Sequence, residues 1–452
     1  MPLPAAFVAQ MQDLLQDQYA DFEAALQKNV PISIRYNPKK EIPKLSTKQV
    51  PWNDLAYYLE ERPIFTLDPH FHAGAYYVQE ASSMFVAEAA KQLLDLSRPL
   101  KVLDLCAAPG GKSTTLLSIL NEESLLVSNE VIKSRYQILR ENLTKWGNSN
   151  IFVTNHDPKD FEGLEGFFDL VLVDTPCSGE GLFRKDAKAV QEWSPEAVQH
   201  CSARQRRILS IAPTLVKKDG ILMYCTCAYN ASENINNVNW LLKTNNLQSE
   251  QLDLSEDWGI TEISNKNAFG YQFYPHLVEG EGFFMSCLRQ KDDLTNTRKR
   301  KNTAFVHLKK VPKKQLELLN PFINEDVDFD YFQTEKGHIF AFPTSLAETF
   351  ADLSTHLRKS AFGTAVGMVK GKSLVPAHAL AMSHIVAPDF PKLSLSKQQA
   401  LQFLKKLAVE IDSTKEGWHL ITYEGLALGW AKVLKRRMNN YYPKEWRIRM
   451  EV

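Results

Sequence analysis

The sequence contains no apolar run that approaches the roughly 18 to 20 residues needed for a membrane-spanning helix. Its opening segment, MPLPAAFVAQMQ, also lacks the basic stretch and the small-residue cleavage site of a signal peptide. We therefore expect a protein that stays in the cytoplasm and has no membrane partner.

Cysteine is scarce. The chain has six cysteines in 452 residues, and no two of them form a Cys-x-x-Cys pair. This usage excludes a disulfide scaffold and disfavours a structural zinc site, so we expect no metal. A lone cysteine is most often a small buried apolar residue. A functional role for any of the six therefore has to be supported by its neighbours.

An excess of either charge is also absent, because 53 basic residues balance 53 acidic ones. Overall charge therefore gives no indication of a nucleic-acid partner. Two local stretches do indicate such a partner. One is the basic run Arg298 to Lys301, and the other is the segment Lys432 to Arg449, in which basic residues are interspersed with Tyr441, Tyr442 and Trp446. The second suits phosphate contact and base stacking, although a solvated surface helix followed by a turn is the alternative interpretation.

The length and the patterning predict several domains around an α/β core. A chain of 452 residues is about three times the usual domain size. From about Ser97 onward, short β-rich runs are mostly separated by helical segments: KVLDLC, SLLVSNE, NIFVT, FDLVLVD and GILMYCT. This alternation is typical of a parallel, doubly wound sheet, whose strand order the sequence does not give.

The flanking segments differ in pattern. A helical apolar pattern at Phe7, Met11, Leu14, Leu15 and Phe22 is followed by the extended segment 32–37, which predicts an α/β lead-in over residues 1–96. The core is expected over 97–290, and the polar segment 291–303 reads as a linker. Residues 304–452 mix strand patterns with a helix expected over 396–410, which indicates a compact α+β region.

A glycine-rich turn follows the first core strand. Glycines at the carboxyl end of a strand let the backbone approach a ligand, and the next helix presents free N–H groups. The turn consists of Cys106, Ala107, Ala108, Pro109, Gly110, Gly111 and Lys112. The ending GGKST also resembles a phosphate-binding P-loop, but Cys106 stands where that motif needs its first glycine.

Carboxylates follow the next two strands. Glu130 closes the second strand, where an acid can accept hydrogen bonds from both ribose hydroxyls. Asp157 follows the third strand and is placed to meet an adenine edge. Each acid alone would more often be a solvated strand end, but three strand ends at one edge predict a nucleoside cofactor.

Two later strands carry thiols to the same edge. The fourth ends in Asp174 and Cys177, and the fifth ends in Cys225 and Cys227. A thiolate that adds to carbon 6 of a cytosine makes carbon 5 nucleophilic, an acid at N3 stabilises the developing charge, and a base then removes the proton from carbon 5. The residues alone leave open which cysteine attacks.

At these residues the chain resembles the RNA 5-methylcytosine methyltransferases of the Nol1/Nop2/Sun family, and within it the bacterial enzymes that act on 16S ribosomal RNA. The matching motifs run in family order: VLDLCAAPGGKS, SNE, NHD, VDTPCSGEG, YCTCAYN and YPHLVEGEGFF. The resemblance continues upstream through IRYNP and FHAGAYYVQEASSM, and downstream through VPAHALAM, LALGWAK and NNYYPKEWR. It therefore covers nearly the whole chain.

The resemblance implies a Rossmann-like, seven-stranded methyltransferase domain that uses S-adenosylmethionine. Carried over by position, it makes the turn from Cys106 to Lys112, together with Glu130, Asp157 and Asp174, the cofactor site. It makes Cys227 the nucleophile, Cys177 the thiol that helps to release the methylated RNA, and Asp174 a residue that faces the base. The family commonly has Ser in place of Cys225 and Ala in place of Thr175. We expect Cys225 to face away from Cys227 and to serve in packing.

The resemblance also implies an RNA partner, either 16S ribosomal RNA or the small ribosomal subunit, bound by a monomer. The C-terminal region resembles small RNA-binding modules of the PUA type, which favours RNA contact at Lys432 to Arg449. We expect Ser33 to Asn37 and Phe71 to Ser83 to frame the RNA channel. A transfer RNA methyltransferase and a non-catalytic RNA-binding assembly factor are the alternatives.

Overall fold

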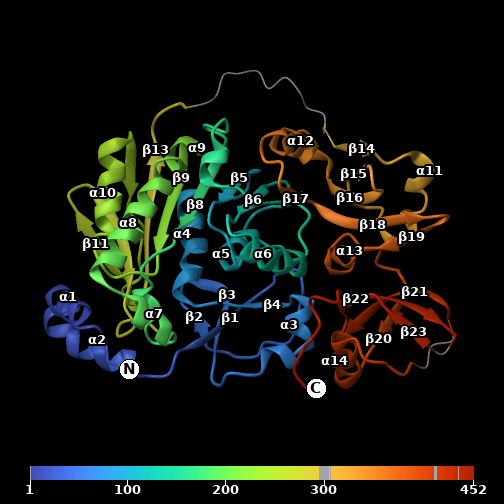
Figure 1. Ribbon diagram of the computed structural model, residues 1–452, viewed down its shortest axis with the longest axis horizontal. Helices are drawn as coiled ribbons and strands as arrows, with labels where there is room; N and C mark the ends of the chain where they lie inside the picture. The colour runs from blue at the N-terminus through green and yellow to red at the C-terminus, as the bar shows by residue number, and fades with distance from the viewer. Residues whose placement is uncertain (1, 295–304, 306, 412–414, 436, 452) are drawn as a thin grey trace.

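The computed structural model describes residues 2–294, 305, 307–411, 415–435 and 437–451 (Figure 1). The predicted basic run Arg298 to Lys301 and most of the predicted linker lie outside the described residues. Within the described part of the chain, no helix combines the length and the apolar character needed to cross a membrane.

One large mixed sheet forms the centre of the molecule. Its order is β11-β12-β13-β9-β8-β5-β6-β7-β17, and β10 also pairs with β13. Neighbouring strands from β7 to β9 run parallel, whereas β13 is antiparallel to β9. The strands are β5 (Lys101–Asp104), β6 (Leu125–Asn129), β7 (Ile151–Thr154), β8 (Phe168–Asp174), β9 (Val216–Thr226), β10 (Leu247–Glu250), β11 (Thr261–Asn265), β12 (Ala268–Phe273), β13 (Phe283–Gln290) and β17 (Ser360–Phe362).

The sheet confirms the predicted α/β fold but exceeds the expected seven strands. The five strands read from the sequence are all present, and β12 and β13 complete the seven. The additional strands β10 and β11 extend one side, and β17 pairs with β7 at the other edge. β17 comes from the region that the sequence placed after the linker, so that region contributes to the central sheet.

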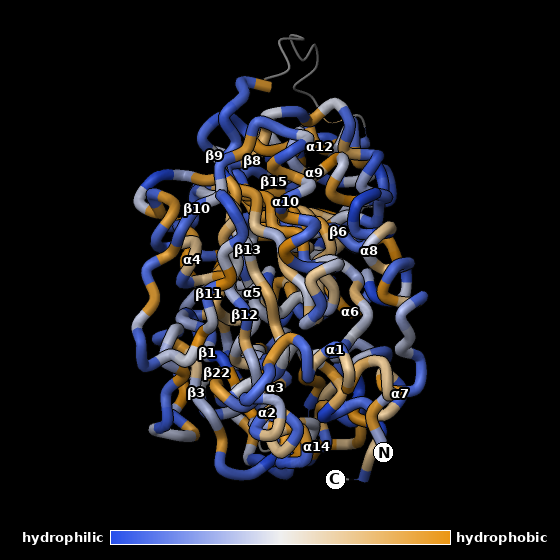
Figure 2. Tube along the Cα trace, turned by 90° about the vertical axis from the view of Figure 1, so that its left-hand side faces the viewer, coloured by the Kyte–Doolittle hydropathy of each residue, from blue (hydrophilic) through white to orange (hydrophobic). Residues whose placement is uncertain are grey.

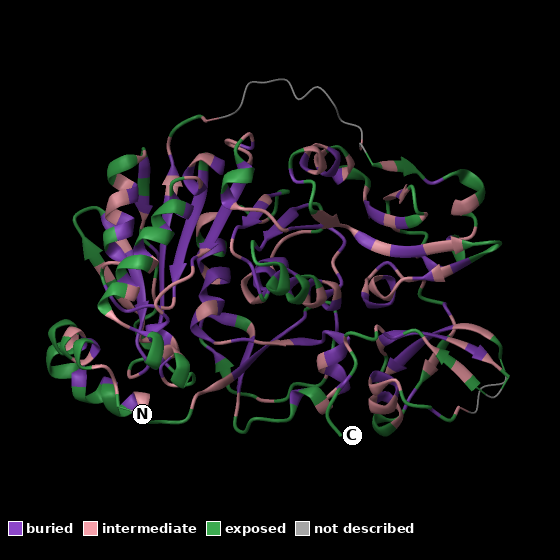
Figure 3. Cartoon of the chain, in the orientation of Figure 1, coloured by how far each residue is buried: buried purple, intermediate pink, exposed green. Residues whose placement is uncertain are grey.

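Helices cover both faces of this sheet, and each face has its own apolar core. The parallel strands are buried on both faces, which explains their nearly continuous Val and Leu runs (Figure 3). In Figure 2 the hydrophobic segments gather along the inner strands. The helices are α4 (Phe85–Leu93), α5 (Gly111–Leu117) and α6 (Lys133–Trp146) on one face, and α8 (Pro195–Leu209), α9 (Ala212–Leu215) and α10 (Ile235–Thr244) on the other.

Two helix ends follow directly from the residues found there. Ser194 accepts a hydrogen bond from the Ala197 N–H at 3.1 Å and begins α8, with Pro195 in the first turn. Gly147 ends α6 with a φ of 97°, a backbone conformation that favours glycine. Shorter elements connect the core: η3 (Ser82–Met84), η4 (Pro158–Phe161), η5 (Glu180–Leu182), α7 (Ala187–Glu192) and η6 (Glu256–Trp258).

The N-terminal region is the predicted α/β lead-in. Phe7, Met11 and Phe22 are buried, whereas Leu14 is 43% exposed. The first two helices pack on aromatic residues of the central domain, and a four-stranded antiparallel sheet of order β2-β3-β1-β4 follows them. The elements are α1 (Ala5–Leu15), η1 (Gln16–Gln18), α2 (Tyr19–Leu26), β1 (Ile32–Tyr36), β2 (Gln49–Val50), β3 (Asn53–Leu59), η2 (Phe65–Leu67), α3 (Pro69–Ala73) and β4 (Tyr76–Val78).

Segment Ser33 to Asn37 is buried, so the expectation that it frames an RNA channel is wrong. Its central residue, Arg35, donates hydrogen bonds to Thr114 Oγ1 at 2.6 Å and to Ser118 Oγ at 2.7 Å. Its guanidinium also lies 4.7 Å from the ring centre of Trp146. Burial lowers the pKa of Arg35 to about 9. This segment therefore fastens the N-terminal sheet to α5 and α6.

The C-terminal end of α6 is a second junction. Asn37 Nδ2 donates to Trp146 O at 2.9 Å, and Lys40 Nζ donates to Lys145 O at 2.6 Å. These bonds satisfy carbonyl groups that a helix end leaves without partners. On the other side, the Lys145 ammonium lies 5.3 Å from the ring centre of Trp446. The N-terminal and C-terminal regions thus meet at the end of one helix.

The region after the predicted linker contains two sheets, and one apolar core contains residues of both. A five-stranded sheet has the order β14-β15-β16-β18-β19, and a four-stranded sheet has the order β20-β21-β22-β23. Phe332, Phe342 and Phe350 of the first part join the core of the central sheet. The strands are β14 (Leu308–Lys310), β15 (Phe329–Thr334), β16 (His338–Pro343), β18 (Thr364–Lys370), β19 (Ser373–Pro376), β20 (Lys392–Ser394), β21 (Gly417–Tyr423), β22 (Leu426–Leu434) and β23 (Arg437–Asn440).

The helix expected over 396–410 is shorter than predicted. It ends at Lys405, because Lys406 has a left-handed backbone with a φ of 63°. The Lys406 ammonium donates to Tyr442 O at 2.6 Å, which ties this end to the last segment of the chain. The helices of the region are α11 (Lys313–Leu316), η7 (Asn320–Phe322), η8 (Thr344–Leu346), α12 (Ala347–His356), α13 (His378–Met382) and α14 (Lys397–Lys405).

We predict that Arg35→Met lowers the free energy of unfolding by about 2 to 4 kcal/mol, because it leaves several buried acceptors without a donor. Chemical denaturation followed by tryptophan fluorescence measures the change. Arg140→Met, at an exposed position of α6, is the control and should change stability by less than about 0.5 kcal/mol. Equal stability of the two variants would contradict a docking role for Arg35.

Candidate active site

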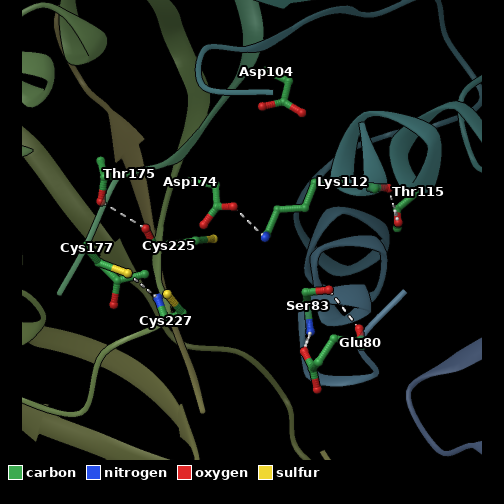
Figure 4. Close-up of polar contacts among 12 residues, drawn as sticks. Glu80, Ser83, Asp104, Lys112, Thr115, Asp174, Thr175, Cys177, Cys225 and Cys227 are labelled. Atoms are coloured by element: carbon green, nitrogen blue, oxygen red, sulfur yellow. Dashed lines mark hydrogen bonds and ion pairs between the residues drawn. The ribbon is translucent and has the colours of Figure 1, made fainter. Parts of the chain in front are cut away.

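A cavity of about 540 Å³ lies at the carboxyl ends of β5, β6, β8 and β9. Parallel strands place ligands at this edge. Lys112 of the glycine-rich turn lies on one side of it, and Cys177 and Cys227 of the two thiol loops lie on the other (Figure 4). The cavity is therefore where sequence analysis predicted a site.

The glycine-rich turn is anchored from α6. Arg135 Nη2 donates to Ala108 O at 2.6 Å, and Asn142 Nδ2 donates to Pro109 O at 2.8 Å. Gly110 has a φ of 112° and stands immediately before α5, which explains the glycine at this position. Of the predicted residues Cys106, Ala107, Ala108, Pro109, Gly110, Gly111 and Lys112, all except Gly110 line the cavity.

Asp104 is a site residue that sequence analysis missed. It ends β5, lines the cavity and is 1% exposed. Its Oδ2 accepts from Ser113 Oγ at 2.7 Å, while its Oδ1 is buried and has no hydrogen-bond partner within the described residues. Burial, with the nearby Asp174, raises its pKa to about 7. An unpaired buried carboxylate oxygen at a cavity wall favours a cationic or hydrogen-donating ligand.

The two predicted ribose and adenine residues differ in placement. Glu130 lines the cavity, where its Oε1 accepts from Ile132 N at 2.8 Å and its Oε2 lies 3.2 Å from Arg135 Nη1. Asp157 instead caps η4 and pairs with Arg207 at 3.1 Å, and its side chain is not part of the cavity wall. Its neighbours Pro158 and Arg207 are. The Asp157 side chain therefore holds Pro158 and Arg207 in the cavity wall without being part of the wall itself.

Lys112 and Asp174 form an ion pair across the cavity, with Nζ 2.7 Å from Oδ2. Burial alone would lower the pKa of Lys112, but Asp174 and Asp104 outweigh it and the net shift is upward. Lys112 therefore stays protonated. Figure 4 places Asp174 between this ammonium and the two thiol loops.

The predicted thiols meet at the far side of the cavity. Cys177 and Cys227 both line it and are partly exposed, and the Cys227 N–H donates to Cys177 Sγ at 3.3 Å. Contact with the Cys227 side chain and burial raise the pKa of Cys177 well above its ordinary value. The protonated form of the Cys177 thiol is therefore favoured as long as this contact persists.

Two buried carboxylates that sequence analysis also missed hold the thiol loops in place. Glu180 accepts hydrogen bonds from Tyr229 N at 2.6 Å and from Asn230 N at 3.0 Å, which joins the β8 loop to the β9 loop. Glu233 accepts from Ser178 N at 3.0 Å, and burial raises its pKa. The sequence does show an acidic residue near each cysteine motif, and this could have identified Glu180 and Glu233. The spacing of a motif, however, does not show that these side chains are buried.

Cys225 is buried and packs in the core, as expected. The expected direction is wrong, because side chains two apart in a strand share a face. Cys225 interacts electrostatically with Lys112 and Asp174, and burial raises its pKa well above the ordinary value. It is absent from the cavity wall. Burial, not direction, keeps this thiol out of the site.

The segments expected to contact RNA are only partly accessible. Gln79, Glu80 and Ser83 of the Phe71 to Ser83 segment line the cavity. In the C-terminal stretch, Tyr442 is buried against α14, so it is not free to stack on a base. Tyr441 is 39% exposed, and its ring centre lies 4.5 Å from that of Trp418.

No group of three or more His, Cys, Asp or Glu residues with a geometry suited to a metal occurs in the described ranges.

Three sequence models of known families match the chain. One describes the 16S rRNA methyltransferases RsmB/F and matches residues 91–289, another describes the N-terminal domain of 16S rRNA methyltransferase RsmF and matches 3–81, and a third describes the RsmF PUA domain and matches 390–448. The chain is thus similar to the RsmB/F methyltransferases over residues 91–289 and to RsmF in the regions on either side. It is accordingly an RNA methyltransferase.

Curated members of the RsmB/F family match over nearly the full length. The Ribosomal RNA small subunit methyltransferase F of Escherichia coli O157:H7 is 29% identical, and the match covers 98% of this chain and 96% of that protein. The protein of the same name from Aliivibrio salmonicida is 28% identical, with 98% and 97% covered.

Solved structures support the fold. A methyltransferase homolog protein from Pyrococcus horikoshii is 26% identical with a TM-score of 0.55, over 63% of this chain and 94% of that one. NSun6 from Pyrococcus horikoshii is 18% identical with a TM-score of 0.55, over 64% of this chain and 99% of that one, and shares the fold.

We predict a pH-dependent stability difference between the wild type and Asp104→Asn. A carboxyl whose pKa rises to about 7 on folding contributes full stability below its unfolded pKa, and this contribution is lost as the pH rises toward 7. The ligand-free wild type should therefore lose stability between pH 4 and 7 relative to the variant, by roughly 4 kcal/mol at most.

Denaturant unfolding at several pH values measures this difference. Asp257→Asn, at an exposed position, is the control and should show no such trend. A constant difference between wild type and Asp104→Asn across this pH window would contradict the raised pKa.

Proposed function

We propose that this protein transfers a methyl group from S-adenosylmethionine to carbon 5 of a cytosine in 16S ribosomal RNA. The observation that carries the proposal is the pair of thiols, Cys177 and Cys227, which two different strands bring into contact at the wall of one cavity. The same cavity holds acids suited to a positively charged nucleoside cofactor. The similarity to the RsmB/F methyltransferases supports the reaction class.

The residues of the cavity fit S-adenosylmethionine. The unpaired Oδ1 of Asp104 suits the amino group of the cofactor, and Glu130 suits its ribose hydroxyls. The backbone from Cys106 to Lys112 and the Asp157 loop, through Pro158, would complete the site. When bound, this cofactor supplies an electrophilic methyl group.

We assign the attack to Cys227 and the release to Cys177. The Cys227 sulfur would bond to carbon 6 of the cytosine and thereby make carbon 5 nucleophilic. The family resemblance supports this assignment, because Cys227 stands in the Thr-Cys motif and Cys177 stands in the Pro-Cys motif. After methylation, loss of the carbon 5 proton allows the bond between sulfur and carbon 6 to break, and Cys177 assists at this stage.

Asp174 is the residue placed to face the base. It lies between Lys112 and the thiols in Figure 4 and lines the cavity. A hydrogen bond between Asp174 and the N3 region of the cytosine would stabilise the charge that develops on the ring. Lys112, held at 2.7 Å, fixes the orientation of this carboxylate.

The names of the curated relatives favour 16S ribosomal RNA over transfer RNA as the substrate. We propose that residues 1–96, 97–290 and 304–452 act as the RNA-facing, catalytic and RNA-binding parts. In the last part, Trp418 and Tyr441 offer ring surfaces beside Lys432, whose ammonium lies 5.9 Å from the Trp418 ring centre. These residues suit contact with RNA.

The test is methylation of unmodified 16S ribosomal RNA and of small subunits with radiolabelled S-adenosylmethionine. Cys227→Ala should abolish both methyl transfer and the covalent complex, because the attacking sulfur is lost. Cys177→Ala should accumulate a protein–RNA adduct that survives denaturing electrophoresis, because release is impaired. Cys201→Ala, which alters a partly exposed thiol outside the cavity wall, is the matched control and should behave as wild type.

Normal turnover by Cys177→Ala would refute the release role, and an adduct formed by Cys227→Ala would refute the attack role. Transfer RNA assayed in parallel tests the alternative substrate. Binding without any transfer of label would indicate a non-catalytic assembly factor.

A further inference from the structure

A second cavity, of about 590 Å³, lies between the N-terminal sheet and α6. Its volume is within the range of small-molecule sites, roughly 300 to 1,000 Å³. Tyr77 and Val78 of β4 line both this cavity and the cofactor cavity, so the two share a wall. Asn142, another lining residue, donates to Pro109 O of the glycine-rich turn at 2.8 Å. We refer to it as the β4–α6 pocket.

Five aromatic residues line the β4–α6 pocket. Phe65, Phe71, Tyr76, Tyr77 and Trp146 contribute to it. Phe71 and Tyr77 are only partly buried, so their rings keep accessible surface. Ile64 also lines the pocket and is 59% exposed, so it offers apolar surface to a ligand there. This surface suits a flat ligand with an apolar face.

The charged groups of the pocket favour an anionic ligand. Arg62 is exposed and forms no ion pair within the described ranges; its guanidinium lies 5.6 Å from the Phe65 ring centre. The Lys145 ammonium lies 5.6 Å from the Phe71 ring centre and pairs with Glu141 at 2.6 Å. One unpaired cation beside stacking surfaces matches a nucleotide, which combines a base with a phosphate.

We propose that the β4–α6 pocket binds an unstacked base of the RNA near the target cytosine, a role that rests on the proposed function. RNA is read in sequence mainly through splayed bases that stack on aromatic side chains. The cytosine must leave its stack to reach the thiols, so neighbouring bases lose a partner as well. The shared wall at Tyr77 places a stacking site for such a base beside the cavity that receives the target.

The proposal is tested in the full-length protein by steady-state methylation of unmodified 16S ribosomal RNA. Phe71→Leu keeps an apolar side chain but removes the ring, and should raise the KM for RNA at least about fivefold, the lower end for one lost base–aromatic stack. Phe71→Tyr restores the ring and should restore most of the affinity. The dissociation constant for S-adenosylmethionine should not change.

A second pair of variants avoids the risk of misfolding. Ile64→Glu places a negative charge at the exposed rim and should also raise the KM for RNA, whereas Leu14→Glu, at an exposed position of α1, should not. An unchanged KM in both Phe71→Leu and Ile64→Glu would overturn the proposal. An effect confined to assembled subunits and absent with free RNA would also overturn it, because it would indicate a protein contact. Failure of the wild type to methylate any RNA would instead refute the proposed function.

Discussion

The close approach of three loops at Gly181 is the constraint on which the candidate site depends. The Gly181 N–H donates to Cys227 O at 2.8 Å, and a Cβ at position 181 would lie 2.4 Å from Gly282 O. Only glycine fits, so the loops after β8 and β9 and the loop before β13 are held against one another. The thiols and the wall at Phe283 take their positions from this contact. The buried side chains of Glu180 and Glu233 then fix the loops by hydrogen bonds.

Much of the fold and part of the site could be predicted from the sequence. Buried parallel strands read as continuous Val and Leu runs, and the carboxyl ends of such strands share an edge, so the glycine-rich turn and both thiol loops were placed correctly. Asp104 was missed because it lies inside the strand motif, where burial rather than spacing makes it unusual. Segment Ser33 to Asn37 was misassigned because polar residues suggest a surface, whereas here they satisfy buried donors and acceptors between domains.

The C-terminal half shows why the boundary between the central domain and the C-terminal region was harder to predict from the sequence. β17 has only three residues, too few to produce a pattern, yet it extends the central sheet by pairing with β7. Phe332, Phe342 and Phe350 lie in the region expected to be separate, yet they pack in the core of the central sheet. Sequence patterns reveal which residues are apolar, and long-range packing decides which core they join.

Helix α6 fixes the distance between the glycine-rich turn and the junction of the N-terminal and C-terminal regions. At its first turn, Arg135 contacts Glu130 and the glycine-rich turn, and at its last turn Lys145 and Trp146 hold the N-terminal and C-terminal regions. A helix of 14 residues is about 21 Å long. The length of this helix therefore sets how far the N-terminal and C-terminal regions stand from the glycine-rich turn. Inserting or deleting residues in α6 would change this spacing and the rotation of the two ends, while leaving every side chain of the cavity in the sequence.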